Sequence, residues 1–213
     1  MYVAIEGVIG VGKTTLARLL QSAFNADILL EVFEENPFRS DFYADRHRYA
    51  FQTQIFFLLS RYHQQPRTVP NLISTGKNLF GDYTFAQDAL LARINLKGDE
   101  LEMYYKVHEA LAEKIQKPDL LVYLQATTDT LMQRITLRDR SYERQMDRSY
   151  INELNLAYDD FFSKPFDHTP VLTVDSNNLN VIENSEHLKW IENSIRQSLS
   201  LPPFQQLLPM PNV

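Results

Sequence analysis

The chain has 213 residues, of which 44% are hydrophobic and 23% are charged, and its formal net charge is −6 at pH 7. This composition is ordinary for a globular protein and excludes a fibrous or mainly disordered chain. The negative charge argues against a nucleic-acid polymer or an anionic membrane surface as the main partner. The absence of cysteine excludes disulfides, thiolate metal sites and thiol nucleophiles. Without a leader or a membrane-spanning run, a cytoplasmic location is expected.

A glycine-rich segment, GVIGVGKTT at residues 7–15, directly follows an apolar run at the start of the chain. It fits the spacing G-x-x-x-x-G-K-[ST] of a loop whose backbone N–H groups surround a polyphosphate. The positive end of the following helix dipole favours the same anion. We expect Lys13 to reach the outer phosphates of ATP and Thr14 to ligate Mg²⁺. The residues expected to contact ATP are Gly7, Val8, Ile9, Gly10, Val11, Gly12, Lys13, Thr14 and Thr15.

The N-terminal half of the sequence predicts two strands around a helix, at Tyr2–Glu6, Lys13–Phe24 and Ile28–Val32. Apolar residues at helical spacing predict a helix over Arg46–His63, and Pro66 is expected to end it. A third strand is predicted in two pieces, Leu72–Ser74 and Leu79–Phe80. This order of elements is a βαβ opening.

The C-terminal half begins with a long amphipathic helix, predicted over Gly98–Lys117 and closed by Pro118. The later elements are a strand at Leu120–Leu124, a helix at Thr127–Leu137, a polar segment at Arg138–Arg148, a helix to Phe162, a strand at Val171–Val174 and a helix at Glu186–Leu199. Alternating strands and helices predict an α/β fold with a mostly parallel, five-stranded sheet. We expect one domain over residues 1–201 and an irregular tail over 202–213.

Polar residues that follow the predicted strands and helices supply candidate catalytic groups, because ligands gather at the carboxyl ends of parallel strands. Glu31 would face the outer end of the triphosphate and accept a proton from an attacking hydroxyl. Arg134 and Arg138 share a helix face, and with Arg140 they would neutralise phosphate charge. The alternative for Glu31 is a solvated acid at the end of a strand. The alternative for the three arginines is that they only complement the dipole at the end of a helix.

Together these motifs resemble the deoxynucleoside kinases, a family that includes deoxycytidine, deoxyguanosine and deoxyadenosine kinases. The resemblance covers residues 2 to about 165, and Asn36-Pro37 is similar to the bacterial members. It implies a P-loop kinase fold with an arginine-rich lid at about residues 138–148. The implied reaction is phosphorylation of a deoxynucleoside 5′-hydroxyl by ATP with Mg²⁺ in nucleotide salvage, with Glu31 as general base.

The resemblance also assigns the substrate contacts. Tyr43 and Glu143 would hold the sugar 3′-hydroxyl, and Gln54 would bind the base through its amide. Asp88 is aligned with an aspartate that contacts the base. The implied substrate is deoxyadenosine or deoxyguanosine, with deoxycytidine as the remaining possibility.

One motif departs from the family pattern, which has [DE]-R-S after the third strand where this chain reads GDY. Aligned with the acid, Asp82 would help to hold hydrated Mg²⁺, and Tyr83 then replaces an arginine that contacts the 5′-hydroxyl. A shift of one residue pairs Asp82 with the arginine instead. The contribution of this arginine is therefore open.

Two other functions are consistent with parts of the sequence. A nucleoside monophosphate kinase similar to thymidylate kinase would need an arginine for the acceptor phosphate, and Arg39, Arg46 and Arg48 keep this alternative open. A nucleotide-dependent switch would leave the predicted substrate contacts without a role. The amphipathic helices centred on residues 55 and 108 carry more apolar surface than one sheet face needs, and family members dimerise through such helices, so we expect a homodimer.

Overall fold

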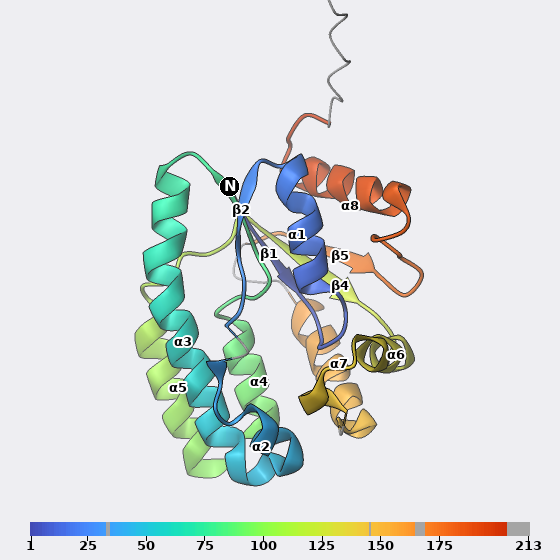
Figure 1. Cartoon of the computed structure of the whole chain (residues 1–213). Helices are drawn as coiled ribbons and strands as arrows, with labels where there is room; N and C mark the ends of the chain where they lie inside the picture. Colours follow the sequence, from blue (N-terminus) through green and yellow to red (C-terminus); the bar gives the residue numbers. More distant parts are fainter. Residues whose placement is uncertain (33–34, 145, 165–168, 204–213) are drawn as a thin grey trace, which may run out of the picture.

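The computed structural model describes residues 1–32, 35–144, 146–164 and 169–203. Five strands form one sheet in the order β2-β3-β1-β4-β5, and every pair of neighbours is parallel (Figure 1). The strands are β1 Tyr2–Glu6, β2 Ala26–Leu29, β3 Asn78–Gly81, β4 Leu120–Gln125 and β5 Val171–Asp175. The predicted five-stranded sheet is confirmed, and it is wholly parallel.

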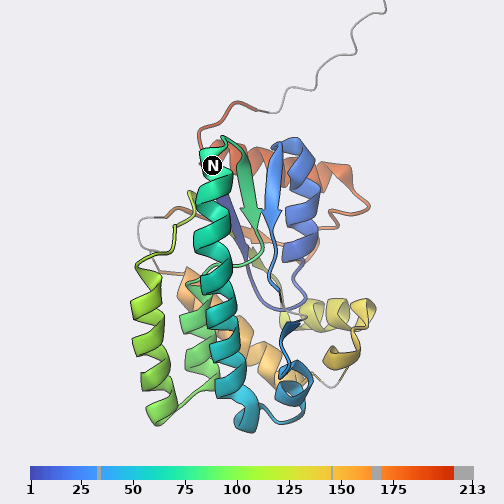
Figure 2. The same ribbon diagram turned by 60° about the vertical axis from the view of Figure 1, so that its left-hand side comes forward.

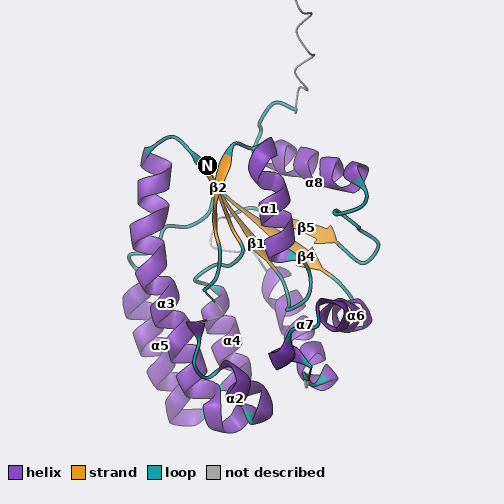
Figure 3. Cartoon of the chain, in the orientation of Figure 1, coloured by secondary structure: helices purple, strands orange, loops and turns teal. Residues whose placement is uncertain are grey.

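Helices cover the sheet and extend beyond its carboxyl end (Figures 2 and 3). The first four are α1 Lys13–Ala23, α2 Arg39–Ala44, α3 Arg46–Ser74 and α4 Gln87–Asn95. The others are α5 Gly98–Ala112, α6 Thr128–Arg138, α7 Arg148–Phe162 and α8 Ser185–Ser198. Helix α1 packs against the sheet and α8, whereas α3, α4 and α5 pack together and α4 contacts α7. No helix of the described segments is long and apolar enough to cross a membrane.

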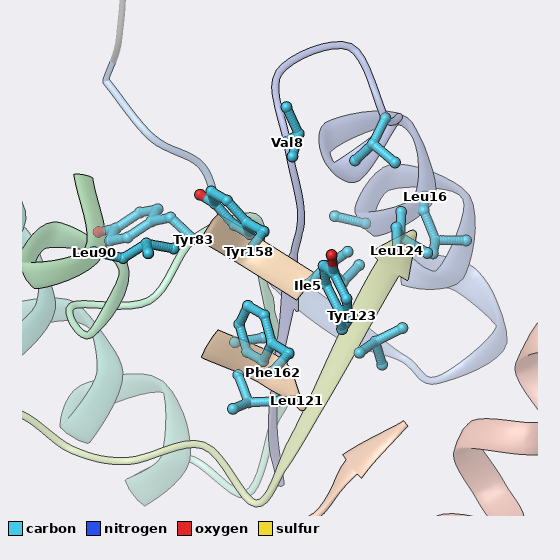
Figure 4. Close-up of a cluster of buried hydrophobic side chains, with 14 of the residues drawn as sticks. Ile5, Val8, Leu16, Tyr83, Leu90, Leu121, Tyr123, Leu124, Tyr158 and Phe162 are labelled. Atoms are coloured by element: carbon cyan, nitrogen blue, oxygen red, sulfur yellow. The ribbon is translucent and has the colours of Figure 1, made fainter. Parts of the chain in front are cut away.

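The part of the hydrophobic core shown in Figure 4 is built from strands together with apolar side chains of α1, α4 and α7, and the other helices add to the core around it. Ile5, Leu121 and Leu16 are almost fully buried in it. On the side of α7, the Tyr123 and Phe162 rings stack with centroids 4.5 Å apart. This core fixes β1, α1 and β4 relative to one another, and these elements carry the phosphate loop.

Helix α3 differs most from the sequence prediction. It does not end before Pro66 but continues through Pro66 and Pro70, so the strand predicted at Leu72–Ser74 is wrong. An interior proline removes a helical hydrogen bond and costs about 3 kcal/mol. The buried Val69 and the packing of α3 on α4, α5 and β3 offset that cost.

Other boundaries also shift. Strand β2 ends at Leu29, not at the predicted Val32, so Glu31 lies in the loop that follows the strand. The two helices α2 and α4 were not predicted, and α5 ends at Ala112, before the predicted Lys117. The predicted tail lies outside the described residues from 204 on.

Candidate functional site

The phosphate loop joins β1 to α1 through three glycines, Gly7, Gly10 and Gly12, in backbone conformations that disfavour other residues. Gly7 has φ 144° and Gly12 has φ 108°, and α1 begins at Lys13. A Cβ atom on Gly7 would lie 2.5 Å from the carbonyl oxygen of Leu124 in β4. At Gly7 the loop therefore packs closely against β4. The backbone amides on its other side, together with the start of α1, can bind an anion.

Lys13 lies across the opening of this loop. Its Nζ donates to the carbonyl oxygen of Gly7 at 2.6 Å and to that of Val8 at 3.4 Å. Burial lowers the pKa of Lys13, and the nearby carboxylates of Glu6 and Glu31 oppose this shift. The ammonium group is thus held at the junction between the loop and the acidic residues of the site.

Asp82 connects the donor side of the site to the segment that carries Glu31. Its Oδ2 accepts from the Thr14 hydroxyl at 2.5 Å, and its Oδ1 accepts from the Glu31 backbone N–H at 2.8 Å. Burial raises the pKa of Asp82, and the hydrogen bond from Thr14 opposes the shift. Hydroxyl and carboxylate oxygens are the ligands that Mg²⁺ prefers, so this pair fits the metal role predicted for both residues.

Two cavities meet at this junction. The inner one lies between α2, α3, α4 and α7, and its polar lining includes Tyr43, Gln54, Arg61 and Gln87. The outer one lies over the phosphate loop, and its lining includes Thr14, Asp82, Arg138, Arg140 and Glu143. Four residues line both cavities: Ile9, Lys13, Glu31 and Tyr43. A group in the inner cavity can therefore meet a phosphate in the outer one beside Glu31.

The sequence analysis missed Arg61, a central residue of the inner cavity. Its side chain is only 3% exposed and forms ion pairs with Glu31 through Nη2 and with Asp88 through Nη1. Asp88 is wholly buried. The spacing from Gln54 to Arg61 is seven residues, which places both on one face of a helix, and this was the available signal.

Tyr83, which one of the two possible alignments places at the arginine position, is packed inside the protein. Its ring is wholly buried, and its hydroxyl donates to Gln64 Oε1 at 2.6 Å. The Gln64 amide nitrogen donates in turn to the carbonyl oxygen of Leu30 at 3.0 Å. Tyr83 therefore supports the chain directly before Glu31, and it lies too deep to contact a phosphate.

The far end of the inner cavity carries polar atoms that lack partners. Gln54 is 3% exposed, and neither its Oε1 nor the Thr53 hydroxyl has a hydrogen-bond partner within the described ranges. An unsatisfied buried polar atom costs about 1–3 kcal/mol, so these groups indicate a polar ligand. The apolar lining consists of Phe42, Phe57, Leu91, Tyr150, Leu154 and Tyr158. Such a lining suits a planar ring.

The predicted lid folds over the junction. Arg138 donates to both carboxylate oxygens of Glu143 at 2.7 Å through Nη2, and Glu143 is buried. Arg140 donates to the Tyr142 hydroxyl at 2.9 Å, and the Tyr142 ring stacks on that of Tyr43 at an interplanar angle of 13°. The 3₁₀ turn Ser141–Glu143 thus brings the two residues predicted for the sugar hydroxyl to one wall.

Arg134 contacts the backbone. It donates to the Val11 carbonyl oxygen at 3.2 Å and to the Ser176 carbonyl oxygen at 2.6 Å. Burial lowers the pKa of its guanidinium. The side chain joins the phosphate loop to the segment after β5, and its predicted contact with phosphate stays a prediction.

The arginines that a phosphorylated acceptor would need do not line either cavity where their side chains are described. Arg46 pairs with Glu153 at 2.9 Å and lies over the Tyr150 ring, and Arg48 is exposed beside Tyr49. The side chain of Arg39 lies outside the described part of the structure.

The model of the deoxynucleoside kinase family matches residues 3–200. The chain belongs to the deoxynucleoside kinase family. Deoxyguanosine kinase of Bacillus subtilis (strain 168) is 31% identical to it over 199 residues, which cover 92% of this chain and 96% of that protein. Deoxyadenosine kinase of Dictyostelium discoideum is 32% identical over 178 residues, which cover 81% of this chain and 71% of that protein.

Solved structures agree with this assignment. Deoxyadenosine kinase from M. mycoides, with the products dCMP and a flexible dCDP bound, superposes with a TM-score of 0.81 at 26% identity. The match covers 92% of this chain and all of that one. The P-loop kinase fold and the membership of a deoxynucleoside kinase family, both implied by the resemblance, are confirmed. They favour an enzyme that phosphorylates nucleosides over the thymidylate-kinase-like alternative.

Proposed function

We propose that this family member transfers the γ-phosphoryl group of ATP to the 5′-hydroxyl of a purine deoxynucleoside in nucleotide salvage. The products are the deoxynucleoside monophosphate and ADP. The observation that carries the proposal is the junction where Glu31 and Lys13 line both cavities. A nucleoside in the inner cavity directs its 5′-hydroxyl to this junction, and the triphosphate reaches it from the phosphate loop.

The reaction is an in-line displacement. The 5′-oxygen forms a bond to the γ-phosphorus while the bond from that phosphorus to the β–γ bridging oxygen breaks, and ADP leaves. Glu31 accepts the proton of the 5′-hydroxyl. Lys13, Arg134 and Arg138 stabilise the charge on the transferring group.

The donor side fits ATP and Mg²⁺. The space beside Gly12 is open, and the start of α1 that follows it favours the negative charge of a phosphate. Thr14 and Asp82 would hold Mg²⁺, which when bound neutralises phosphate charge. Exchange of the Thr14–Asp82 hydrogen bond for metal ligation needs little movement, because both oxygens already face each other.

The sugar is held at the wall formed by Tyr43 and Glu143. Burial raises the pKa of Tyr43, so its hydroxyl keeps its proton and can donate to the 3′-oxygen. Glu143 accepts from the 3′-hydroxyl when Arg138 turns from it toward the phosphates. Sugars without a 3′-hydroxyl would leave both groups unsatisfied and are expected to be poor substrates.

The base lies against Gln54 and the Arg61–Asp88 pair. We place deoxyguanosine first and deoxyadenosine second. The names of the relatives, deoxyguanosine kinase and deoxyadenosine kinase, support a purine. Deoxycytidine is the remaining candidate.

The test is phosphate transfer from labelled ATP with Mg²⁺ to the four deoxynucleosides and, in parallel, to their monophosphates. Product from nucleosides alone supports the proposal and identifies the preferred base. Product from monophosphates alone would contradict it, because Glu31 would then face a phosphate and not a hydroxyl. A reaction without added Mg²⁺, in the presence of a chelator, is expected to give no product.

We propose further that the enzyme is a cytoplasmic homodimer. Leu59 of α3 and Met103 of α5 are 40% and 53% exposed, and these two helices lie side by side (Figure 1). Together they offer an apolar face that a second copy of the chain can cover by two-fold symmetry. A salvage kinase that draws on the ATP pool is expected in the cytoplasm.

A further inference from the structure

The cation that faces Glu31 comes from α3, because the Nη2 atom of Arg61 pairs with the Glu31 carboxylate. Tyr83, which follows Asp82, is buried and bonded to Gln64. We infer that Arg61 is a positioning residue that holds Glu31 for proton abstraction while it also pairs with Asp88. This inference rests on the proposed function.

The geometry places one guanidinium between two carboxylates. The Nη2 atom of Arg61 pairs with Glu31, and its Nη1 atom pairs with Asp88. The Glu31 side chain is 20% exposed and Asp88 is wholly buried, so both need a counter-charge. Lys13 is the other cation that lines the inner cavity within the described segments, and it is directed at the carbonyl groups of the phosphate loop.

The guanidinium is held in this orientation from several sides. The Phe57 and Tyr83 rings each lie 5.3 Å from its central carbon. With the Gln87 amide turned so that its nitrogen donates to Glu6 Oε2 at 2.9 Å, its oxygen accepts from Arg61 Nη2 at 2.7 Å. The planar fork thus has fixed directions, which a flexible ammonium would lack.

Base recognition and catalysis are therefore coupled through one side chain. A base that binds Asp88 and Arg61 correctly keeps Nη2 on the Glu31 carboxylate, which then faces the 5′-hydroxyl. A base that displaces Arg61 also displaces Glu31. Selectivity among bases will appear in kcat as well as in KM.

The first experiment measures kcat and KM of Arg61→Lys at saturating ATP and Mg²⁺, with the preferred nucleoside. Lysine keeps the charge but cannot contact both carboxylates, so we expect kcat to fall at least about tenfold together with a rise in KM. Arg93→Lys is the matched control, because Arg93 is half-exposed on α4 and lines neither cavity. An increase in KM with unchanged kcat would overturn the inference and leave Arg61 as a base contact.

A double-mutant cycle separates positioning from a merely structural role. If Arg61 acts through Glu31, Arg61→Lys lowers the single-turnover rate in the wild-type background but not in Glu31→Gln. Equal losses in both backgrounds would overturn the inference. Thermal melts monitor folding, and Arg61→Gln repeats the cycle if the lysine variant does not fold. Should the wild-type enzyme phosphorylate no nucleoside, the proposed function fails, and this result is distinct from either outcome of the cycle.

Discussion

The proposed reaction requires a proton acceptor at residue 31, and Glu31 supplies it. We expect Glu31→Gln to lower kcat by about 10²–10⁴-fold, because the amide keeps the shape but accepts no proton. ATP binding, measured by calorimetry, should stay close to wild type, because the phosphate loop is not changed. Glu102→Gln, at an exposed position of α5, is the control. Unchanged turnover in Glu31→Gln would remove the general-base assignment.

Glu6, at the end of β1, gives the fold a pH dependence. It is wholly buried, its Oε1 accepts from the Thr84 backbone and hydroxyl, and burial raises its pKa to about 7. The unfolded chain releases this proton near pH 4.5, so folding binds a proton between these values and stability falls as pH rises through the window.

We expect Glu6→Gln, which resembles the protonated acid, to remove this fall. Its unfolding free energy relative to wild type should rise between pH 5 and pH 8 by up to roughly 3 kcal/mol. Urea melts at the two pH values measure the difference, with Glu102→Gln again as control. A difference that does not change with pH would show that Glu6 is ionised throughout.

Residues with local signals could be predicted from the sequence, and residues that depend on tertiary packing could not. Lys13 and Thr14 could be predicted from the spacing of one loop, and Glu31 from its place near the end of a predicted strand. Arg61 lies thirty residues from Glu31, on a helix whose face toward the cavity is set by packing. Without its partners it reads as an ordinary helical arginine.

At the scale of elements, the turn between β1 and α1 determines whether the phosphate site forms. We expect Gly7→Ala to destabilise the fold by roughly 1–3 kcal/mol and to abolish ATP binding, because its Cβ would meet the Leu124 carbonyl oxygen at 2.5 Å. Gly76→Ala is the control, since Gly76 also has positive φ but open space around it. Equal losses in both variants would assign the effect to backbone conformation alone.

Helix α3 shows why the boundaries of an element are harder to predict than its existence. Periodicity correctly predicts a helix after Arg46, but Pro66 is a strong local stop signal. The continuation to Ser74 depends on contacts with α4, α5 and β3, which the local sequence does not encode. Helix α4, Gln87–Asn95, was not predicted at all, because it has only nine residues.

At the scale of the molecule, the proposed dimer face gives a direct test. We expect sedimentation at micromolar concentration to show a dimer, and the combined variant Leu59→Glu with Met103→Glu to show a monomer, because charge on this face opposes its burial. Leu156→Glu is the control, since Leu156 is 63% exposed on α7, away from α3 and α5. A wild-type monomer, or a variant that still dimerises, would rule out this interface.

The Arg61 guanidinium pairs with both Asp88 and Glu31, and this pairing limits how the substrate preference of such an enzyme can evolve. Most sites let evolution alter the choice of substrate at one position and the speed of reaction at another. Here a change at residue 61 alters both together, so a lineage that shifts toward a new base must pass through slow intermediates. Tolerated substitutions should therefore occur mainly at Gln54, which contacts the nucleobase but does not contact the general base Glu31. A library randomised at residues 54 and 61 would show that asymmetry among its active survivors.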